Sequence, residues 1–163
     1  MTWYSLAVAR RLSGVTLIAA ASTLAIGDGT TNGNIGTGSV SNNGVFAFYH
    51  ADNLTFSNVI GGSGDVVQFG SGTTTLTGNN TYTGSTIIRG GGQIIITSAS
   101  AISYSTNINL GLTNAPGTLD LTSFSTNGFA FGSNQTISGV GVVDSGSSTN
   151  HVITIEGTLS PGN

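Results

Sequence analysis

Apolar residues alternate with small and hydroxyl-bearing residues along much of the chain, most regularly between Gly70 and Ile96. Side chains at every second position share one face of an extended strand, so this alternation predicts β-strands with one buried face. Gly78–Asn80 and Gly90–Gly92 interrupt it with residues that tolerate a positive φ, which predicts turns between short strands. The apolar positions of this stretch are Leu76, Tyr82, Ile88, Ile94 and Ile96.

The composition supports strands and argues against helices. Glycine alone contributes 26 of the 163 residues, and Gly, Ser, Thr and Asn are weak helix formers. The regular spacing of Val, Ile, Leu and Phe argues against a disordered chain. We therefore predict an all-β protein.

The chain resembles itself when it is shifted by 70 residues. Residues 14–26 then align with residues 84–96 without a gap, and four of the thirteen positions are identical. Internal self-similarity of this kind is typical of repeat architectures such as solenoids.

The segment Gly14–Gly27 has two interpretations. It is apolar, follows Arg10 and Arg11 and precedes small residues, as the core of a secretory signal peptide would. Its match to residues 84–96 favours strand–turn–strand instead, because a signal core has no reason to keep the spacing of a distant repeat. We predict the second interpretation. The export signal would then lie upstream or be lost, and Met1 would not begin a complete protein; whether residues 1–27 act as a signal stays open.

The charge and cysteine content exclude several classes of function. Only 6% of the residues are charged and the net charge is −3, which removes the electrostatic attraction that nucleic-acid binding requires. The chain has no cysteine, so it has no disulfides or thiolate metal sites. No apolar run reaches the ~20 residues of a membrane-spanning helix.

The stretch LTGNNTYTGSTIIRGG at Leu76–Gly91 resembles the autotransporter-associated β-strand repeat, also called the passenger-associated transport repeat. The pattern of that family is G-x-G-x-L-x-L-x-G-x-N-x-Y-x-G-x-T-x-I, followed by a Gly-rich turn and a strand. The chain departs from it at Thr74, where the family usually has an apolar residue. The pattern is matched by Gly70, Gly72, Leu76, Gly78, Asn80, Tyr82, Gly84, Thr86 and Ile88.

The resemblance covers roughly residues 14–163, with its best match at residues 70–96, and residues 1–13 are either the degenerate start of a first repeat or a leader-like segment. It implies an exported bacterial passenger that folds as a right-handed single-stranded parallel β-helix, in which the nine matching residues are structural.

The physical chemistry of a solenoid agrees with this expectation. One turn, or rung, cannot bury its apolar face alone, so rungs stack and their inward side chains form continuous columns. At roughly 20-odd residues per rung, the chain would form about seven rungs. A β-sandwich is the alternative, because antiparallel hairpins use the same Asn-Gly turns. The inward candidates are Leu17, Leu24, Ile35, Val45, Phe56, Val66, Leu76, Ile88, Ile94, Ile96, Ile108, Leu119, Leu121, Phe131, Ile137, Val143, Ile153 and Ile155.

Candidates for catalysis and metal binding are few. Asp144-Ser145-Gly146 is similar to the nucleophile region of chymotrypsin-like proteases, but a triad also needs a base held within hydrogen-bond reach of the nucleophile. His50, with Asp52 close by, and His151 are the only histidines. Residues 61–65 resemble a Gly-rich calcium turn, with the aspartate one residue early. We expect turns at both places, and no catalytic residue, metal ion or cofactor.

Two carbohydrate-related functions remain as alternatives. A β-helical polysaccharide lyase or hydrolase needs two carboxyl groups at a defined separation, and stacking of rungs can bring together acids that are isolated in sequence. A small secreted module could instead bind carbohydrate through the aromatic stretch at residues 46–52. The acids are Asp28, Asp52, Asp65, Asp120, Asp144 and Glu156.

The function that we expect is structural and non-enzymatic. The chain would be a β-helical stalk at the bacterial surface or outside the cell, supporting export and display, with a role in adhesion. Its expected partners are surface glycans or other cell-surface proteins, and not nucleic acid. Membrane contact would occur only through a C-terminal translocator that this sequence lacks, and exposed rung edges would allow self-association.

Overall fold

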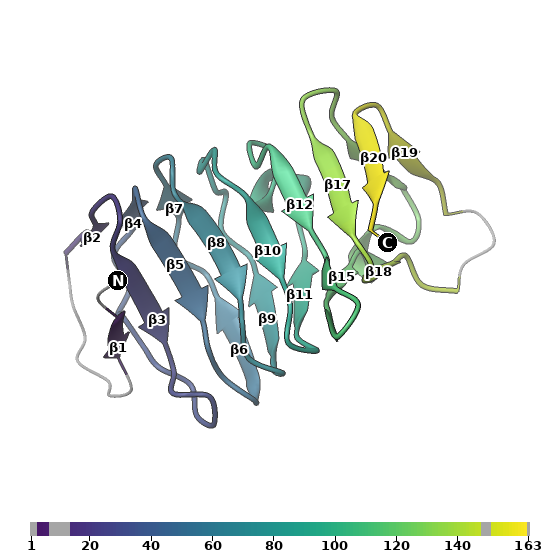
Figure 1. The fold of residues 1–163 in the computed structure, drawn as a ribbon. Helices are drawn as coiled ribbons and strands as arrows, with labels where there is room; N and C mark the ends of the chain where they lie inside the picture. Colours follow the sequence, from purple (N-terminus) through teal and green to yellow (C-terminus); the bar gives the residue numbers. More distant parts are fainter. Residues whose placement is uncertain (1–2, 7–13, 148–150, 163) are drawn as a thin grey trace.

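The computed structural model describes residues 3–6, 14–147 and 151–162. They form a parallel β-solenoid of about 6 turns in which 4% of the chain is helix. The strands are stacked in chain order, and the N- and C-termini lie at opposite ends of the stack (Figure 1). The expected β-helical fold is confirmed.

Three parallel sheets form the sides of the solenoid. Sheet A contains, in spatial order, β1 (Trp3–Leu6), β3 (Thr23–Ile26), β5 (Val45–Phe48), β8 (Asp65–Gln68), β10 (Thr86–Ile88), β12 (Asn107–Asn109), β17 (Thr136–Gly139) and β20 (Thr158–Pro161). Sheet C contains β6 (Asn53–Phe56), β9 (Thr73–Leu76), β11 (Gln93–Ile96), β15 (Thr118–Asp120) and β18 (Val142–Asp144). Sheet B is formed by β2 (Thr16–Ile18), β4 (Val40–Asn42) and β7 (Ile60–Gly61).

The remaining elements are short. β16 (Phe129–Phe131) pairs in parallel with β19 (Ile153–Ile155). β13 (Gly111–Leu112) and β14 (Ala115–Pro116) form a hairpin, the one antiparallel pair among the described strands. Two 3₁₀ turns, η1 (Ala99–Ala101) and η2 (Thr122–Phe124), complete the described elements. The parallel pairing of all other strands rules out the β-sandwich alternative.

The length of a rung sets the number of turns. Thr86 pairs with Val66, twenty residues earlier, whereas Thr136 pairs with Asn107, twenty-nine residues earlier. The longer rung contains the β13–β14 hairpin and η2. The chain therefore completes about 6 turns, fewer than the seven that a constant rung length predicts.

The core is a stack of columns that run along the solenoid axis. On sheet A, Phe46, Val66, Thr86 and Ile108 lie in one column because their strands pair in register. Most of the inward candidates are confirmed. Ile35, Phe56, Val66, Leu76, Ile88, Ile94, Ile96, Ile108, Leu119, Leu121, Phe131 and Ile137 are buried, and Leu24, Val143 and Ile153 are partly buried against the core.

Three inward candidates are wrong. Leu17 is 78% exposed and its neighbour Ile18 is buried instead. Val45 lies in a small outer cluster on sheet A, whereas Phe46 enters the core. Ile155, in the last turn, is 39% exposed. At Leu17 and Val45 the alternation is right but its phase is off by one residue, and such a shift moves a side chain to the opposite face.

Residues 14–27 form strand, turn and strand, as predicted: β2 is followed by a turn at residues 20–21 and by β3. β10, the turn at residues 90–91 and β11 repeat this arrangement 70 residues later. The first pair passes from sheet B to sheet A, and the second passes from sheet A to sheet C. The self-similarity therefore reflects a strand–turn–strand corner used on two edges of the solenoid, with a positive φ at both Ala21 and Gly91 and, in the second corner, also at Gly90. Residues 7–13 lie outside the described part, and their assignment stays a prediction.

Candidate functional site

The glycines of the repeat motif lie where consecutive rungs approach most closely. A Cβ on Gly70 would lie 2.1 Å from the His50 carbonyl oxygen, and one on Gly72 would lie 2.3 Å from the Asp52 carbonyl oxygen. At Gly84 the corresponding distance, to the Gly64 carbonyl oxygen, is 2.3 Å. Gly78 makes a similar approach to Asn58, at 2.6 Å. No other residue fits such distances, so these glycines let the rungs stack.

Asn80 joins three rungs through its buried side chain, which is 2% exposed. Its Oδ1 accepts the backbone N–H of Ile60 at 2.9 Å, and its Nδ2 donates to the Ala101 carbonyl at 3.0 Å. Residues 77–85 contain no strand. At this corner the Asn80 side chain therefore makes the hydrogen bonds between rungs that strand pairing makes elsewhere. Buried backbone groups need such partners.

Tyr82 and Thr86 form a second buried contact within the motif. Thr86 donates its single hydroxyl hydrogen to Ser105 Oγ at 2.8 Å, so Tyr82 donates to Thr86 Oγ1, at 2.6 Å. Burial raises the pKa of Tyr82 to about 12, and the hydrogen bonds to the two hydroxyls oppose the rise only in part. Leu76 and Ile88, the remaining motif residues, are fully buried in the core.

A second buried polar cluster lies at the corner between sheets A and C. His50, Gln68 and Thr74 are all 0% exposed. His50 Nε2 lies 2.9 Å from Thr74 Oγ1, and Thr74 Oγ1 lies 2.7 Å from Gln68 Oε1. On the other side of the ring, His50 Nδ1 lies 2.8 Å from the Asp52 carbonyl oxygen and 3.7 Å from the Asp52 carboxylate.

The glycines of the motif form the wall of this cluster. Gln68 Nε2 donates to the carbonyls of Gly70 and Gly72, each at 3.0 Å. A Cβ on Gly72 would lie 2.6 Å from His50 Nδ1. The two glycines therefore make room for the imidazole and hold the amide of Gln68.

Gln68 and Thr74 interrupt columns that are otherwise apolar. Gln68 pairs in register with Phe48 on one side and Ile88 on the other. Thr74 pairs in register with Leu54 and Ile94. Burying polar groups costs free energy unless they are hydrogen-bonded, and here the two interruptions satisfy each other within one rung. In the sequence, Thr74 stands out only as a departure from the repeat pattern, and no motif marks Gln68.

The protease-like candidate has no catalytic geometry. Asp144 Oδ1 accepts the N–H of Gly146 at 2.8 Å, as in an ordinary turn. His151 Nδ1 contacts the backbone carbonyl of Ser145 rather than its hydroxyl. The turn expected at residues 144–146 is therefore what the structure shows.

The calcium-like segment also has a structural role. Asp65 begins β8, and its Oδ1 accepts the N–H of Ser85 on the next rung at 2.7 Å. Within the described ranges no three metal-ligating side chains come together.

Stacking brings one pair of acids into register. Asp120 and Asp144 are partners on β15 and β18. Asp120 is 8% exposed, and its oxygens accept from Thr122 (backbone N–H at 2.8 Å, hydroxyl at 2.7 Å) and from the Gln93 amide at 2.8 Å. Asp28 accepts from Thr30 and Thr31, and the N–H of Thr31 contributes most to holding the pKa of this carboxyl well below its usual range. The carboxyl groups of Asp120 and Asp28 each accept hydrogen bonds within a local turn, and Asp120 also accepts from Gln93 on the neighbouring rung.

The aromatic stretch at residues 46–50 does not form an exposed binding face. Phe46, Phe48 and His50 are 0% exposed. In the core, the Phe48 ring packs edge to face with Phe56, and the Phe46 ring is tilted against Phe56. Tyr49 alone points outward, where it packs on Phe69 with ring centroids 5.0 Å apart. The three buried rings are therefore not available to the alternative in which this strand binds carbohydrate.

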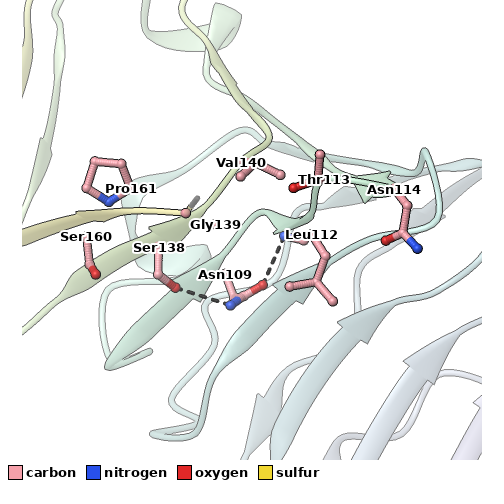
Figure 2. Close-up of a pocket in the computed structure, with 11 residues that line it drawn as sticks. Asn109, Leu112, Thr113, Asn114, Ser138, Gly139, Val140, Ser160 and Pro161 are labelled. Carbon is pink, nitrogen blue, oxygen red and sulfur yellow. Dashed lines mark hydrogen bonds between the residues drawn. The ribbon is translucent and has the colours of Figure 1, made fainter.

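A shallow hollow of about 410 Å³ lies beside the β13–β14 hairpin, between the ends of β12, β17 and β20. Figure 2 shows Asn109 among the residues that line it; Asn109 Nδ2 donates to Ser138 Oγ at 3.2 Å and Oδ1 accepts the N–H of Gly111 at 2.9 Å. The lining contains amides, hydroxyls and the aliphatic residues Leu112 and Val140, and it contains no acid and no aromatic ring.

Comparisons with known proteins identify the central repeat. The family model of the passenger-associated-transport-repeat matches residues 66–92, a stretch that runs from β8 through β9 and β10 and includes all nine motif residues. No curated protein and no solved structure matches the chain. No helix in the described part of the chain is long and apolar enough to cross a membrane. The chain thus carries a passenger-associated transport repeat within a β-solenoid, consistent with a β-helical autotransporter passenger.

Proposed function

We propose that this β-solenoid is a structural stalk of an autotransporter-type passenger, which supports its own export and displays other segments at the bacterial surface. The single observation that carries the proposal is the coincidence of the family match at residues 66–92 with a rung whose motif residues all serve stacking. The repeat family is structural in nature and implies export to the cell surface.

The physical idea is that rungs fold one after another outside the cell. Each rung that stacks on its predecessor satisfies backbone groups and buries an apolar column, so the chain cannot slide back. Asn80 and Gly84 matter to such a step because they connect a strand-free corner to the rungs on both sides.

The test is pulse-labelled secretion with two variants of residues 70–96. In the first, the inward residues are permuted among themselves and with the glycines, which destroys stacking. In the matched control, only exposed residues such as Thr77, Asn79, Thr81 and Thr83 are permuted. We expect export to slow or stall in the first variant and to be unchanged in the control. Export at the normal rate in the first variant would contradict the proposal.

An adhesive contribution would use the surface of the stalk, with surface glycans or other cell-surface proteins as partners. The hollow beside β13–β14 supports this part of the proposal, because its amides and hydroxyls are the groups that recognise sugar hydroxyls. We expect Asn114→Ala, at an exposed lining position, to weaken binding to a glycan array. Identical binding profiles for the variant and the unchanged chain would remove the hollow from the proposal.

A further inference from the structure

We propose that the buried cluster of His50, Asp52, Gln68 and Thr74 forms a covalent cross-link by itself: an ester bond between the Thr74 hydroxyl and the Gln68 side chain. The inference goes beyond the stalk function and does not depend on it. It rests on a nucleophile, a base and an electrophile that meet in one sealed corner of the solenoid.

Thr74 and His50 have the geometry of an activated nucleophile. Thr74 Oγ1 lies 2.9 Å from His50 Nε2. A nucleophilic hydroxyl needs a base at this distance and a third group that orients the base. Asp52 is that third group, because its backbone carbonyl lies 2.8 Å and its carboxylate 3.7 Å from His50 Nδ1.

Two groups, His50 Nε2 and Gln68 Oε1, lie within hydrogen-bond distance of the Thr74 hydroxyl. The Asp52 carbonyl can only accept, so the ring carries a hydrogen on Nδ1. In the neutral ring, Nε2 is then an acceptor and competes with Gln68 Oε1 for the one hydrogen of the Thr74 hydroxyl. When the hydrogen points to Nε2, the hydrogen bond to Gln68 Oε1 is lost and a lone pair of Oγ1 is free, and a small rotation of the carboxamide then turns Cδ toward Oγ1.

The electrophile is held in place by its own amide. Gln68 Oε1 accepts from Thr74 Oγ1 at 2.7 Å, and Oε1 is bonded to Cδ, the carbon to be attacked. Gln68 Nε2 donates to the carbonyls of Gly70 and Gly72. These two carbonyls fix the carboxamide and can accept hydrogen bonds from the nitrogen as it leaves.

The step balances without a co-reactant. Thr74 Oγ1 attacks Gln68 Cδ and forms a C–O bond, while its proton moves to His50 Nε2. The C–N bond to Nε2 breaks, and His50 returns the proton to the departing nitrogen. The products are the ester and one ammonia, and the histidine is restored.

Burial makes the product durable. His50, Gln68 and Thr74 are 0% exposed, so bulk water reaches the ester only past Asp52 and hydrolysis is slow. The side chain of Asp52 is 51% exposed beside the ring, which gives ammonia a short way out. Among the described hydrogen bonds, no backbone N–H donates to Gln68 Oε1, so the reaction lacks an oxyanion hole and we expect it to be slow.

The test is mass spectrometry of the folded full chain after incubation for weeks at neutral pH. Trypsin cleaves after arginine and releases Leu12–Arg89 from the denatured protein, a peptide that contains all four residues. We expect this peptide to be lighter by one ammonia and to give no backbone fragments from within residues 68–74. Mild alkaline hydrolysis should then add one water and leave glutamate at position 68.

Four variants separate the cross-link from other sources of the same mass loss. Thr74→Val keeps the shape without the hydroxyl and should keep the full mass, whereas Thr74→Ser should still cross-link. His50→Gln, which retains hydrogen-bonding groups, should slow the reaction at least tenfold. Thr86→Val alters a buried threonine that has no histidine contact and should cross-link normally.

Succinimide formation at Asn32-Gly33 or Asn43-Gly44 also releases ammonia, but it would persist in Thr74→Val and map outside residues 68–74. That pattern would overturn the proposal. A full-mass peptide from the folded, incubated chain would overturn it too, and the cluster would then be a hydrogen-bonded core only.

Discussion

Ala21 is the only residue other than glycine, among those that the structure describes, with a positive φ, at 61°. It occupies the corner between β2 and β3, and Gly91 occupies the corresponding corner 70 residues later with a φ of 77°. A left-handed conformation costs an L-residue roughly 1–2 kcal/mol. Ala21→Gly removes this cost but increases the freedom of the unfolded chain, so we expect a net stabilisation of about 0.5–1 kcal/mol, measured by denaturant unfolding.

Gly91→Ala is the matched control. A Cβ on Gly91 meets no atom within 4 Å, so only the backbone conformation opposes the substitution. We expect it to lower the free energy of unfolding by about 1 kcal/mol. Changes of the same sign in the two variants would contradict the assignment of equivalent corners.

Tyr82 links the stability of the repeat to alkaline pH. Its pKa is raised from 10.0 to about 12 by burial. The unfolded chain therefore loses the phenol proton first, and the folded state loses stability as the pH rises through this window, by at most about 1.4 kcal/mol per pH unit. The contribution is complete below pH 10 and is lost above about pH 12.

Tyr82→Phe tests this linkage through stability measured against pH. The variant loses the hydrogen bond to Thr86, which costs about 1 kcal/mol at neutral pH. It should also lose the phenol's part of the alkaline decline, so the two stability curves converge above pH 10. Parallel curves up to pH 12 would contradict the burial of Tyr82.

At the scale of single strands, β2 tests the phase of the alternation. Ile18 is 4% exposed and Leu17 is 78% exposed. We expect Ile18→Ala to cost about 2–3 kcal/mol through loss of packing. Leu17→Ala should change stability by less than about 0.5 kcal/mol. The reverse order in thermal or denaturant unfolding would restore the phase that the sequence predicts.

The phase could not be read from the sequence for a physical reason. In TLI both the second and the third residue are large and aliphatic, so a period of two fits either phase. The choice is made by the partner strand, where Val40 and Asn42 are buried and Ser41 is not. In the best repeat the flanking hydroxyls fix the phase locally, and the inward positions Leu76 and Ile88 were predictable.

The two buried polar clusters, one around Asn80 and Tyr82 and one around His50, also differ in whether a local sequence pattern marks them. Asn80 and Tyr82 belong to a local motif that the sequence displays, and both are buried. In the second cluster His50, in the loop after β5, lies 24 positions before Thr74 on β9, and Gln68 on β8 lies six positions before Thr74. No local pattern connects His50 to the other two residues. Only the exact rung length brings His50 over Thr74. A rung one residue longer would have separated them, so the register had to be known first.

At the scale of the whole molecule, the solenoid grows by addition of rungs, and each end of the stack is a sheet edge. β18 and β20 are the last strands of sheets C and A, and β19 ends the sheet that it forms with β16. Leu159 on β20 continues the inward column of Ile137 and is 57% exposed. An exposed edge with an apolar column is a template for another strand.

We therefore expect the isolated chain to associate as its concentration increases. Leu159→Lys should weaken this association at least tenfold, because a lysine in the column opposes stacking of a further rung. Sedimentation velocity over a range of concentrations measures the effect. Tyr104→Lys is the matched control, since Tyr104 is 58% exposed but lies in the turn before β12 and not on a terminal strand. If both variants associate like the unchanged chain, or if the unchanged chain stays monomeric, the end of the stack is not a self-association surface.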